Sequence, residues 1–516
     1  SSSLGYPLSG WSKISLMLEI LFSAIAYLGS PDVLLAIIGG TFFGIIVGAI
    51  PGLGSLLGIT VVLPFTFVLD QQSSIALLLG TYCGSVYGGC IPAILINPPG
   101  TPQSAATLLD GYPMARNGYP ARAIGYATVG SVIGGLFSCA VLVLVAPSLA
   151  AFGLRFGPIE FFALGVFALT CIAAVSRESQ IKGILAALLG MFLATIGLDP
   201  MSGISRYDFD LFELASGFGL IPVLVGMFAL SEVFWRLSDK NTGTVTTKAQ
   251  VGFELPKLRD LAKRYKVILK SAFIGTWIGS LPGIGATTAS LISYAEAKRT
   301  SPNKEKFGTG EADGVLASET ANNAVTAGAL VPTLAFGVPG DPVTAVMLGA
   351  LTIQNIYPGP QLFIEHRELM TFLFVALFVV NILMLLMGAT LSPLFSRVLK
   401  IPEPILLSGV VVLVVIGTYS INTSGFDLLV LLMFGLLGLC LRYFMFPLAP
   451  VVIGFVLSPL IESSFRRGMI IANGDFMVFF EKPIALILFI LTLIFLCWPM
   501  MRFYFNEKVN KNTGKL

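Results

Sequence analysis

Gly337-Val338-Pro339-Gly340-Asp341-Pro342 interrupts a long apolar stretch of the chain, and Asn97-Pro98-Pro99-Gly100-Thr101-Pro102 interrupts another in the same manner. Proline removes a backbone donor and clashes with the preceding helical turn, and glycine permits positive φ, so neither hexapeptide can continue a helix. Pro99 matches Pro339 and Gly100 matches Gly340 at one offset, 339 − 99 = 240. The sequence therefore predicts two broken helices at corresponding places in a repeat.

A second motif, GxxxGxxPGxG, also occurs twice, at residues 44–54 and 275–285. Its offset is 275 − 44 = 231 residues, which is nine fewer than 240. An additional polar loop at 299–308, between the two motifs of the second half, fits this difference. Each copy divides an apolar run into two arms, which predicts a helical hairpin ahead of each broken helix. Interrupted apolar segments at matching places in two halves indicate the binding site of a secondary transporter.

The composition places the chain in a membrane. Of its 516 residues, 55% are hydrophobic and 11% are charged, whereas soluble domains are usually about 25% charged. Counting apolar runs against about 20 residues per span predicts an all-α polytopic membrane protein with about 10–12 full spans besides the hairpins. The chain has one histidine, His366, and its six cysteines lie in apolar runs without CxxC spacing. We therefore expect neither an enzyme active site nor a transition-metal or other cofactor site.

Basic residues are concentrated between the two halves, at 236–270, and the positive-inside rule predicts that this segment and the C-terminal tail are cytoplasmic. The 266–298 hairpin lies between basic segments and the 31–69 hairpin does not, so we expect re-entrant hairpins and inverted repeats. We interpret the basic linker as a topology signal and expect no nucleic-acid partner. The predicted domains are a first transmembrane repeat at 1–236, a cytoplasmic linker at 237–265, a second transmembrane repeat at 266–501 and a cytoplasmic tail at 502–516.

The breaks and hairpin tips predict an anion site. Thr101 and Asp341 each precede a proline and suit a helix N-cap, and Ser55 and Thr287 are placed to cap the second hairpin arms. Four helix N-termini would then converge, and their exposed N–H groups and positive dipole ends suit a carboxylate. The predicted substrate-binding residues are Asn97, Pro99, Gly100, Thr101 and Ser104 at the first break, Pro339, Gly340, Asp341 and Thr344 at the second, and Gly52, Gly54, Ser55, Gly283, Gly285 and Thr287 at the tips.

A polar run on the helix that leads into the second break predicts a cation site. Ser318, Glu319, Thr320, Asn322 and Asn323 carry oxygen donors inside an apolar segment, where an ionisable residue is functional by default. Carbonyls freed before the break, at Gly337, add to them. We expect Na⁺ as the coupling ion; the alternative for these residues is hydrogen bonding between helices.

The segment 110–116 is expected to form a turn at the membrane interface.

These motifs resemble the large permease subunit of the tripartite tricarboxylate transporters. The resemblance rests on the two hexapeptides, both PGxG motifs, Asp110-Gly111-Tyr112-Pro113-Met114-Ala115 and Glu319-Thr320-Ala321-Asn322-Asn323, and it extends over nearly the whole chain. It implies a bacterial inner-membrane carrier that works with a small four-helix membrane subunit and a periplasmic solute-binding protein. It also implies that a citrate-like di- or tricarboxylate is the substrate and that uptake is usually driven by sodium.

The leading hypothesis is a secondary active importer, with a substrate carboxylate held by the amides of Gly100, Thr101, Gly340 and Asp341. Alternating access, in an elevator-like form, would move the hairpins and breaks against regular helices such as 121–147 and 367–396. One alternative is a proton-coupled carrier of another organic anion. A channel would need a continuous polar lining, and an intramembrane enzyme would need a nucleophile or metal constellation.

Overall fold

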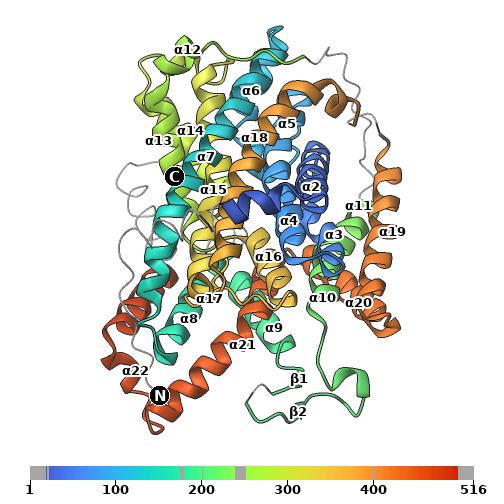
Figure 1. Cartoon of the computed structure of the whole chain (residues 1–516), viewed down its shortest axis with the longest axis vertical. Coiled ribbons are helices and arrows are strands. Elements are labelled where there is room, and N and C mark those ends of the chain that lie inside the picture. Colours follow the sequence, from blue (N-terminus) through green and yellow to red (C-terminus); the bar gives the residue numbers. More distant parts are fainter. Residues whose placement is uncertain are drawn as a thin grey trace, which may run out of the picture.

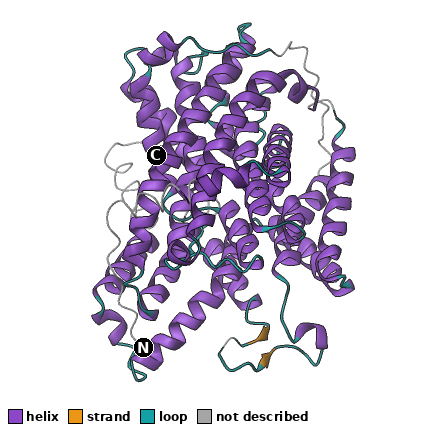
Figure 2. Ribbon diagram, viewed as in Figure 1, coloured by secondary structure: helices purple, strands orange, loops and turns teal. Residues whose placement is uncertain are grey.

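Helices account for nearly all of the regular structure in the computed structural model (Figure 2). The structure describes Glu19 and residues 22–174, 179–199, 201–238, 252–398 and 401–497. The predicted C-terminal tail, 502–516, and residues 239–251 of the predicted linker lie outside these residues. The strands in the described part are β1 (Gly197–Leu198) and β2 (Ser205–Arg206), which pair antiparallel with Gly197 opposite Arg206.

The first half carries its hairpin and broken helix where the proline and glycine pattern predicts them (Figure 1). The hairpin arms are α2 and α3, and the broken helix consists of α4 and α5 before the break and a 3₁₀ turn at Pro102–Ala105 after it. The segment expected to be an interface turn is instead the helix α6. The helices of this half are α2 (Pro31–Ala49), α3 (Gly54–Val62), α4 (Gln71–Gly88), α5 (Cys90–Ile96), α6 (Leu108–Arg116), α7 (Pro120–Gly153), α8 (Pro158–Ala174), α9 (Gln180–Leu193), α10 (Leu220–Val225) and α11 (Ser231–Ser238).

The second half repeats this order, with α13 and α14 as hairpin arms and α15 and α16 on either side of the break. The labelled helices are α12 (Leu258–Lys263), α13 (Tyr265–Gly279), α14 (Gly285–Thr300), α15 (Ala312–Phe336), α16 (Pro342–Ile353), α17 (Leu362–Glu365), α18 (Arg367–Val398), α19 (Glu403–Asn422), α20 (Gly425–Tyr443), α21 (Leu448–Ile471) and α22 (Val478–Glu481), and a further apolar helix follows at Pro483–Cys497. Eight helices of the described residues are long and apolar enough to cross a membrane. This number is below the expected 10–12 because several apolar helices, such as α3 and α16, have fewer than 18 residues.

The GxxxG glycines allow the first arm of each hairpin to pack closely against the broken helix of the same half. A Cβ on Gly44 would lie 2.5 Å from the Thr81 carbonyl oxygen, and one on Gly275 would lie 2.3 Å from that of Ala321. Thr81 and Ala321 are related by the same offset as the two breaks, 321 − 81 = 240. Small residues allow such close approach of helix backbones. The two halves therefore share one local design.

Each half also holds the loop that precedes the broken helix of the other half. In one direction Asp110, which is fully buried at the end of the first break, accepts from the amides of Gly308, Gly310 and Glu311 at 2.8–2.9 Å. In the other direction Gln354, at the end of α16, donates to the carbonyls of the 66–69 loop. These reciprocal contacts join the hairpins and broken helices of both halves into one packed body.

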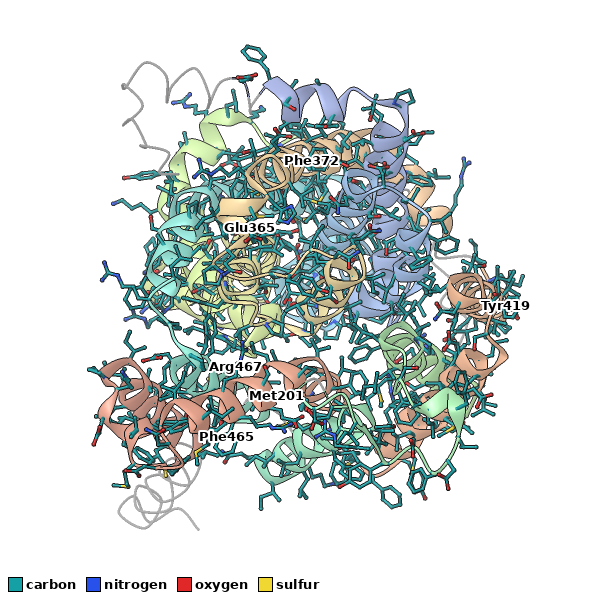
Figure 3. The ribbon with its side chains drawn as sticks, turned by 60° about the horizontal axis from the view of Figure 1, so that its bottom comes forward. Met201, Glu365, Phe372, Tyr419, Phe465 and Arg467 are labelled. Carbon is teal, nitrogen blue, oxygen red and sulfur yellow. The ribbon has the colours of Figure 1, made fainter. Side chains whose placement is uncertain are left out.

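The long helices expected to form a separate scaffold pack against this body. A Cβ on Gly134 of α7 would lie 2.1 Å from the Thr320 carbonyl oxygen of α15. In turn, Gly135 of α7 lies against Asn381 of α18. A second layer is formed by α8, α9 and α21, and Figure 3 shows Phe465 and Arg467 of α21 in this layer, apart from Phe372 of α18.

Candidate functional site

A cavity of about 440 Å³ lies between the tips of the two hairpins. Seven of the predicted substrate-binding residues line it: Gly52, Gly54, Ser55, Gly283, Gly285, Thr287 and Asp341. Its other walls include Pro102, Gln103, Pro342 and Val343 after the breaks, and Ile172, Phe228, Glu232, Arg442, Pro447, Pro450 and Ile453 from the surrounding helices. Segments that are far apart in the sequence thus meet around one space.

The backbone at the two tips is arranged in the same way in both halves. Gly52 donates its amide to the carbonyl oxygen of Gly100 at 3.1 Å, and Gly283 donates to that of Gly340 at 2.8 Å. Gly52 and Gly283 have φ of 77° and 85°, in the region that favours glycine. Each hairpin tip is therefore tied to the break of its own half by one matching hydrogen bond.

The second hairpin arms begin at the cavity without side-chain caps. The N-cap residues are Leu53 for α3 and Ile284 for α14, and neither makes a side-chain cap hydrogen bond. The expectation that Ser55 and Thr287 act as caps was wrong, because both side chains lie beyond the cap position, inside the first turn. The Ser55 hydroxyl is buried, with 1% of the residue exposed, and has no hydrogen-bond partner among the described residues. The first residues of both helices line the cavity, and neither helix N-terminus has a side-chain cap.

The two breaks end differently. Asp341 caps α16 in a capping box, with its Oδ1 accepting the Thr344 amide at 2.7 Å, as the sequence predicts. Its Oδ2 accepts from the Tyr82 hydroxyl of the other half at 2.7 Å. Thr101 does not cap the turn that follows it, and its hydroxyl lies 3.2 Å from that of Ser104.

The break amides expected to hold a carboxylate are mostly engaged inside the protein. Gly100 donates to the Gly89 carbonyl, Gly340 to the Thr333 hydroxyl and Asp341 to the Thr344 hydroxyl. Gly100 also abuts α2, because a Cβ there would lie 2.0 Å from the Gly48 carbonyl oxygen. The predicted residues that do not line the cavity are Asn97, Pro99, Gly100, Thr101, Ser104, Pro339, Gly340 and Thr344. In this conformation the predicted residues that line the cavity are those of the hairpin tips, together with Asp341.

The polar run on α15 forms a separate, fully buried cluster. The Glu319 carboxylate accepts from Thr107 and, at 3.1 Å, from Ser131 of α7. Asn322 and Asn323 donate their amide N–H groups toward the same carboxylate. The remaining side-chain oxygens of this run, on Thr320, Asn322 and Asn323, are buried without a hydrogen-bond partner among the described residues. Ser318 instead donates to the carbonyls of its own helix, and Gly337 ends α15 with φ of 71°.

Such a set of oxygen donors fits a hard cation. A carboxylate and several neutral oxygens can replace part of the hydration shell of Na⁺, and buried polar atoms without partners are rare. None of these residues lines the cavity. The cavity and the polar cluster on α15 are therefore two separate places in the structure.

Sequence reasoning missed the charged side chains of the cavity wall, Glu232 and Arg442. They come from α11 and α20, which carry neither of the repeated motifs. Arg442 stands in the last turn of its helix, where a lone arginine in the sequence looks the same as a topology signal.

Comparisons with known proteins found two similar relatives and one matching family model. The chain is 36% identical over 446 residues to "Uncharacterized 52.8 kDa protein in TAR-I ttuC' 3'region" of Agrobacterium vitis, covering 86% of this chain and 89% of the relative. It is 38% identical over 211 residues to "Uncharacterized protein in TAR-II ttuC' 3'region" of the same organism, covering 41% of this chain and 87% of that relative. No solved structure matches the chain. The model of the tripartite tricarboxylate transporter TctA family matches residues 34–453, and the chain therefore belongs to this family of membrane transporter components.

Proposed function

We propose that the protein is the large permease subunit of a secondary importer for small di- or tricarboxylates such as citrate. The observation that carries the proposal is the cavity of about 440 Å³ between the two hairpin tips, which is within the usual range for small-molecule sites. The uncapped N-termini of α3 and α14 supply donors and positive dipole ends for a carboxylate. In this proposal the substrate binds at Gly52, Gly54, Ser55, Gly283, Gly285 and Thr287, and the break residues hold the tips in place.

Sodium coupling is part of the same proposal. The buried oxygens of Glu319, Thr320, Asn322 and Asn323 support a Na⁺ site on α15. This helix ends at Gly337, directly before the second break, so an ion bound to α15 would stabilise the break and the tip that is tied to it. Each ligand would then raise the affinity for the other. Proton binding by Glu319 is the alternative source of coupling.

The mechanism that we propose is alternating access with re-entrant hairpins and inverted repeats. The reciprocal contacts of Asp110 and Gln354 support movement of the hairpins and broken helices as one unit, together with α7 and α18. The helices α8, α9, α19, α20 and α21 would then form the stationary part. We place the protein in the bacterial inner membrane beside a small four-helix subunit, with a periplasmic binding protein delivering the substrate.

The test is carboxylate binding by the purified protein in lipid nanodiscs, with NaCl or choline chloride at equal ionic strength. We expect saturable binding of citrate or a related di- or tricarboxylate that is strengthened by Na⁺. Binding that is equal in both salts but depends on pH would replace sodium by protons. No binding of any di- or tricarboxylate in either salt would refute the proposed substrate class.

A further inference from the structure

Among the described residues that line the cavity, the cationic one is Arg442, while the guanidinium of Arg236 lies against Gly52 at the first hairpin tip. Arg442 extends from the last turn of α20, and its side chain is 25% exposed. Its Nη1 donates to Oε2 of Glu232, which also lines the cavity. Its Nε–H group is buried and has no hydrogen-bond partner among the described residues. The guanidinium thus has donor capacity left at the edge of the proposed substrate site.

The counter-charge of Arg442 is shared with a second arginine. Glu232 also accepts from Nε of Arg236 at 2.8 Å through its other oxygen, and Arg236 pairs in addition with Glu403 at 2.6 Å. Arg236 therefore has two carboxylate partners, whereas Arg442 shares its carboxylate partner, Glu232, with Arg236. The four side chains of this network carry two positive and two negative charges, so a substrate carboxylate at Arg442 would replace Glu232 as the acceptor.

The other arginines with an unpartnered Nε do not have this arrangement. Arg206 is held by both oxygens of Glu462, and Arg264 pairs with Glu311 and Asp313. Neither lines the cavity. Of these three arginines, Arg442 thus differs in lining the cavity and in sharing one carboxylate partner, Glu232, with another arginine.

The remaining acid of the cavity wall does not compete for Arg442. Both carboxylate oxygens of Asp341 already accept donors from Thr344 and Tyr82.

We propose that Arg442 donates to a carboxylate of the substrate and that Glu232 is its exchangeable counter-ion when the cavity holds no anion. This inference rests on the proposed function and adds a side chain from outside the repeated motifs to the site. Arginine presents paired donors that match a carboxylate, which lysine cannot reproduce. The substrate would thus be held between the amides of the hairpin tips on one side and Arg442 on the other.

The experiment measures the dissociation constant of citrate in nanodiscs at fixed NaCl for wild type, Arg442→Gln, Arg442→Lys, Glu232→Gln and the control Arg206→Gln. We expect Arg442→Gln to raise the dissociation constant at least tenfold and Arg442→Lys to restore part of the affinity. Glu232→Gln should lower the dissociation constant, because it removes the competing carboxylate. Arg206→Gln also removes an arginine with a buried, unpartnered Nε, yet it should bind as wild type does.

The proposal is overturned if wild type binds citrate and Arg442→Gln binds it equally well. It is also overturned if Glu232→Gln weakens binding as much as Arg442→Gln does, since both groups would then serve only the ion pair. If Arg442→Gln does not fold, a dissociation constant of Glu232→Gln at least tenfold above that of wild type overturns the proposal by itself. If wild type binds no carboxylate, the proposed function fails before the role of Arg442 arises.

Discussion

Replacing Asp110 tests whether the contacts between the halves hold the molecule together. Asp110 is fully buried, and its Oδ1 accepts three amides from the loop that leads into α15. Its Oδ2 accepts the Tyr294 hydroxyl of the second hairpin at 2.9 Å. One carboxylate of the first half thus organises two elements of the second half.

The expected loss follows from these four hydrogen bonds. Asp110→Ala leaves four donors without an acceptor, at roughly 1–3 kcal/mol for each unsatisfied buried group. The losses do not add fully because the donors share one partner, so we expect a total of roughly 4 kcal/mol. Asp110→Asn keeps one carbonyl oxygen for the three amides and loses the charge, and we expect roughly half of that loss.

The assay is thermal unfolding of the purified protein in one detergent, followed by tryptophan fluorescence, with Asp70→Ala as the matched control. Asp70 also accepts two amides, from Gln72 and Ser73, but it is an exposed N-cap within its own half. Its loss should cost about 1 kcal/mol. We expect a melting temperature lowered by roughly 5–10 °C for Asp110→Ala and a much smaller change for the control.

Two outcomes would refute this reasoning. One is a melting temperature of Asp110→Ala within about 2 °C of wild type, which corresponds to less than about 1 kcal/mol. The other is a control that loses as much stability as Asp110→Ala, since the position between the halves would then have no special weight.

Two further predictions concern backbone packing and pH. Gly100→Ala should lower both folded yield and citrate binding, because its Cβ would lie 2.0 Å from a backbone oxygen. Gly285→Ala has open space around its Cβ at φ of 73° and should lower the free energy of unfolding by only about 1 kcal/mol. Size-exclusion chromatography compares the folded yields of the two variants, and equal yields would contradict the packing argument. Arg466 donates to both oxygens of Asp199 and holds the pKa of that carboxyl well below its usual range. A depressed folded-state pKa stabilises the protein above the unfolded value of about 3.9 and loses this effect as the pH falls below it. The difference in melting temperature between wild type and Asp199→Asn should therefore shrink between about pH 5 and pH 3, and a constant difference would contradict this assignment.

The sequence predicted the breaks and hairpins because proline and glycine act on the backbone locally. Residues 97–101 and 337–341 interrupt helices as expected, and the motif glycines take positive φ at both tips. The Asp341 cap was also predicted, since a cap depends on neighbours within one turn. The expected inversion of the repeats, the re-entrant character of the hairpins and the sidedness of the loops stay predictions.

The sequence by itself thus determined where helices stop, that two halves repeat one design and that the chain belongs in a membrane, since each of these follows from local backbone chemistry or composition. Only the tertiary structure decided which polar groups face the cavity. Ser55 lines it as an unpartnered hydroxyl, Gly100 packs against α2, and Arg442 enters from α20. Side-chain surroundings depend on helices that are hundreds of residues apart in the chain, and no local pattern records which of them meet.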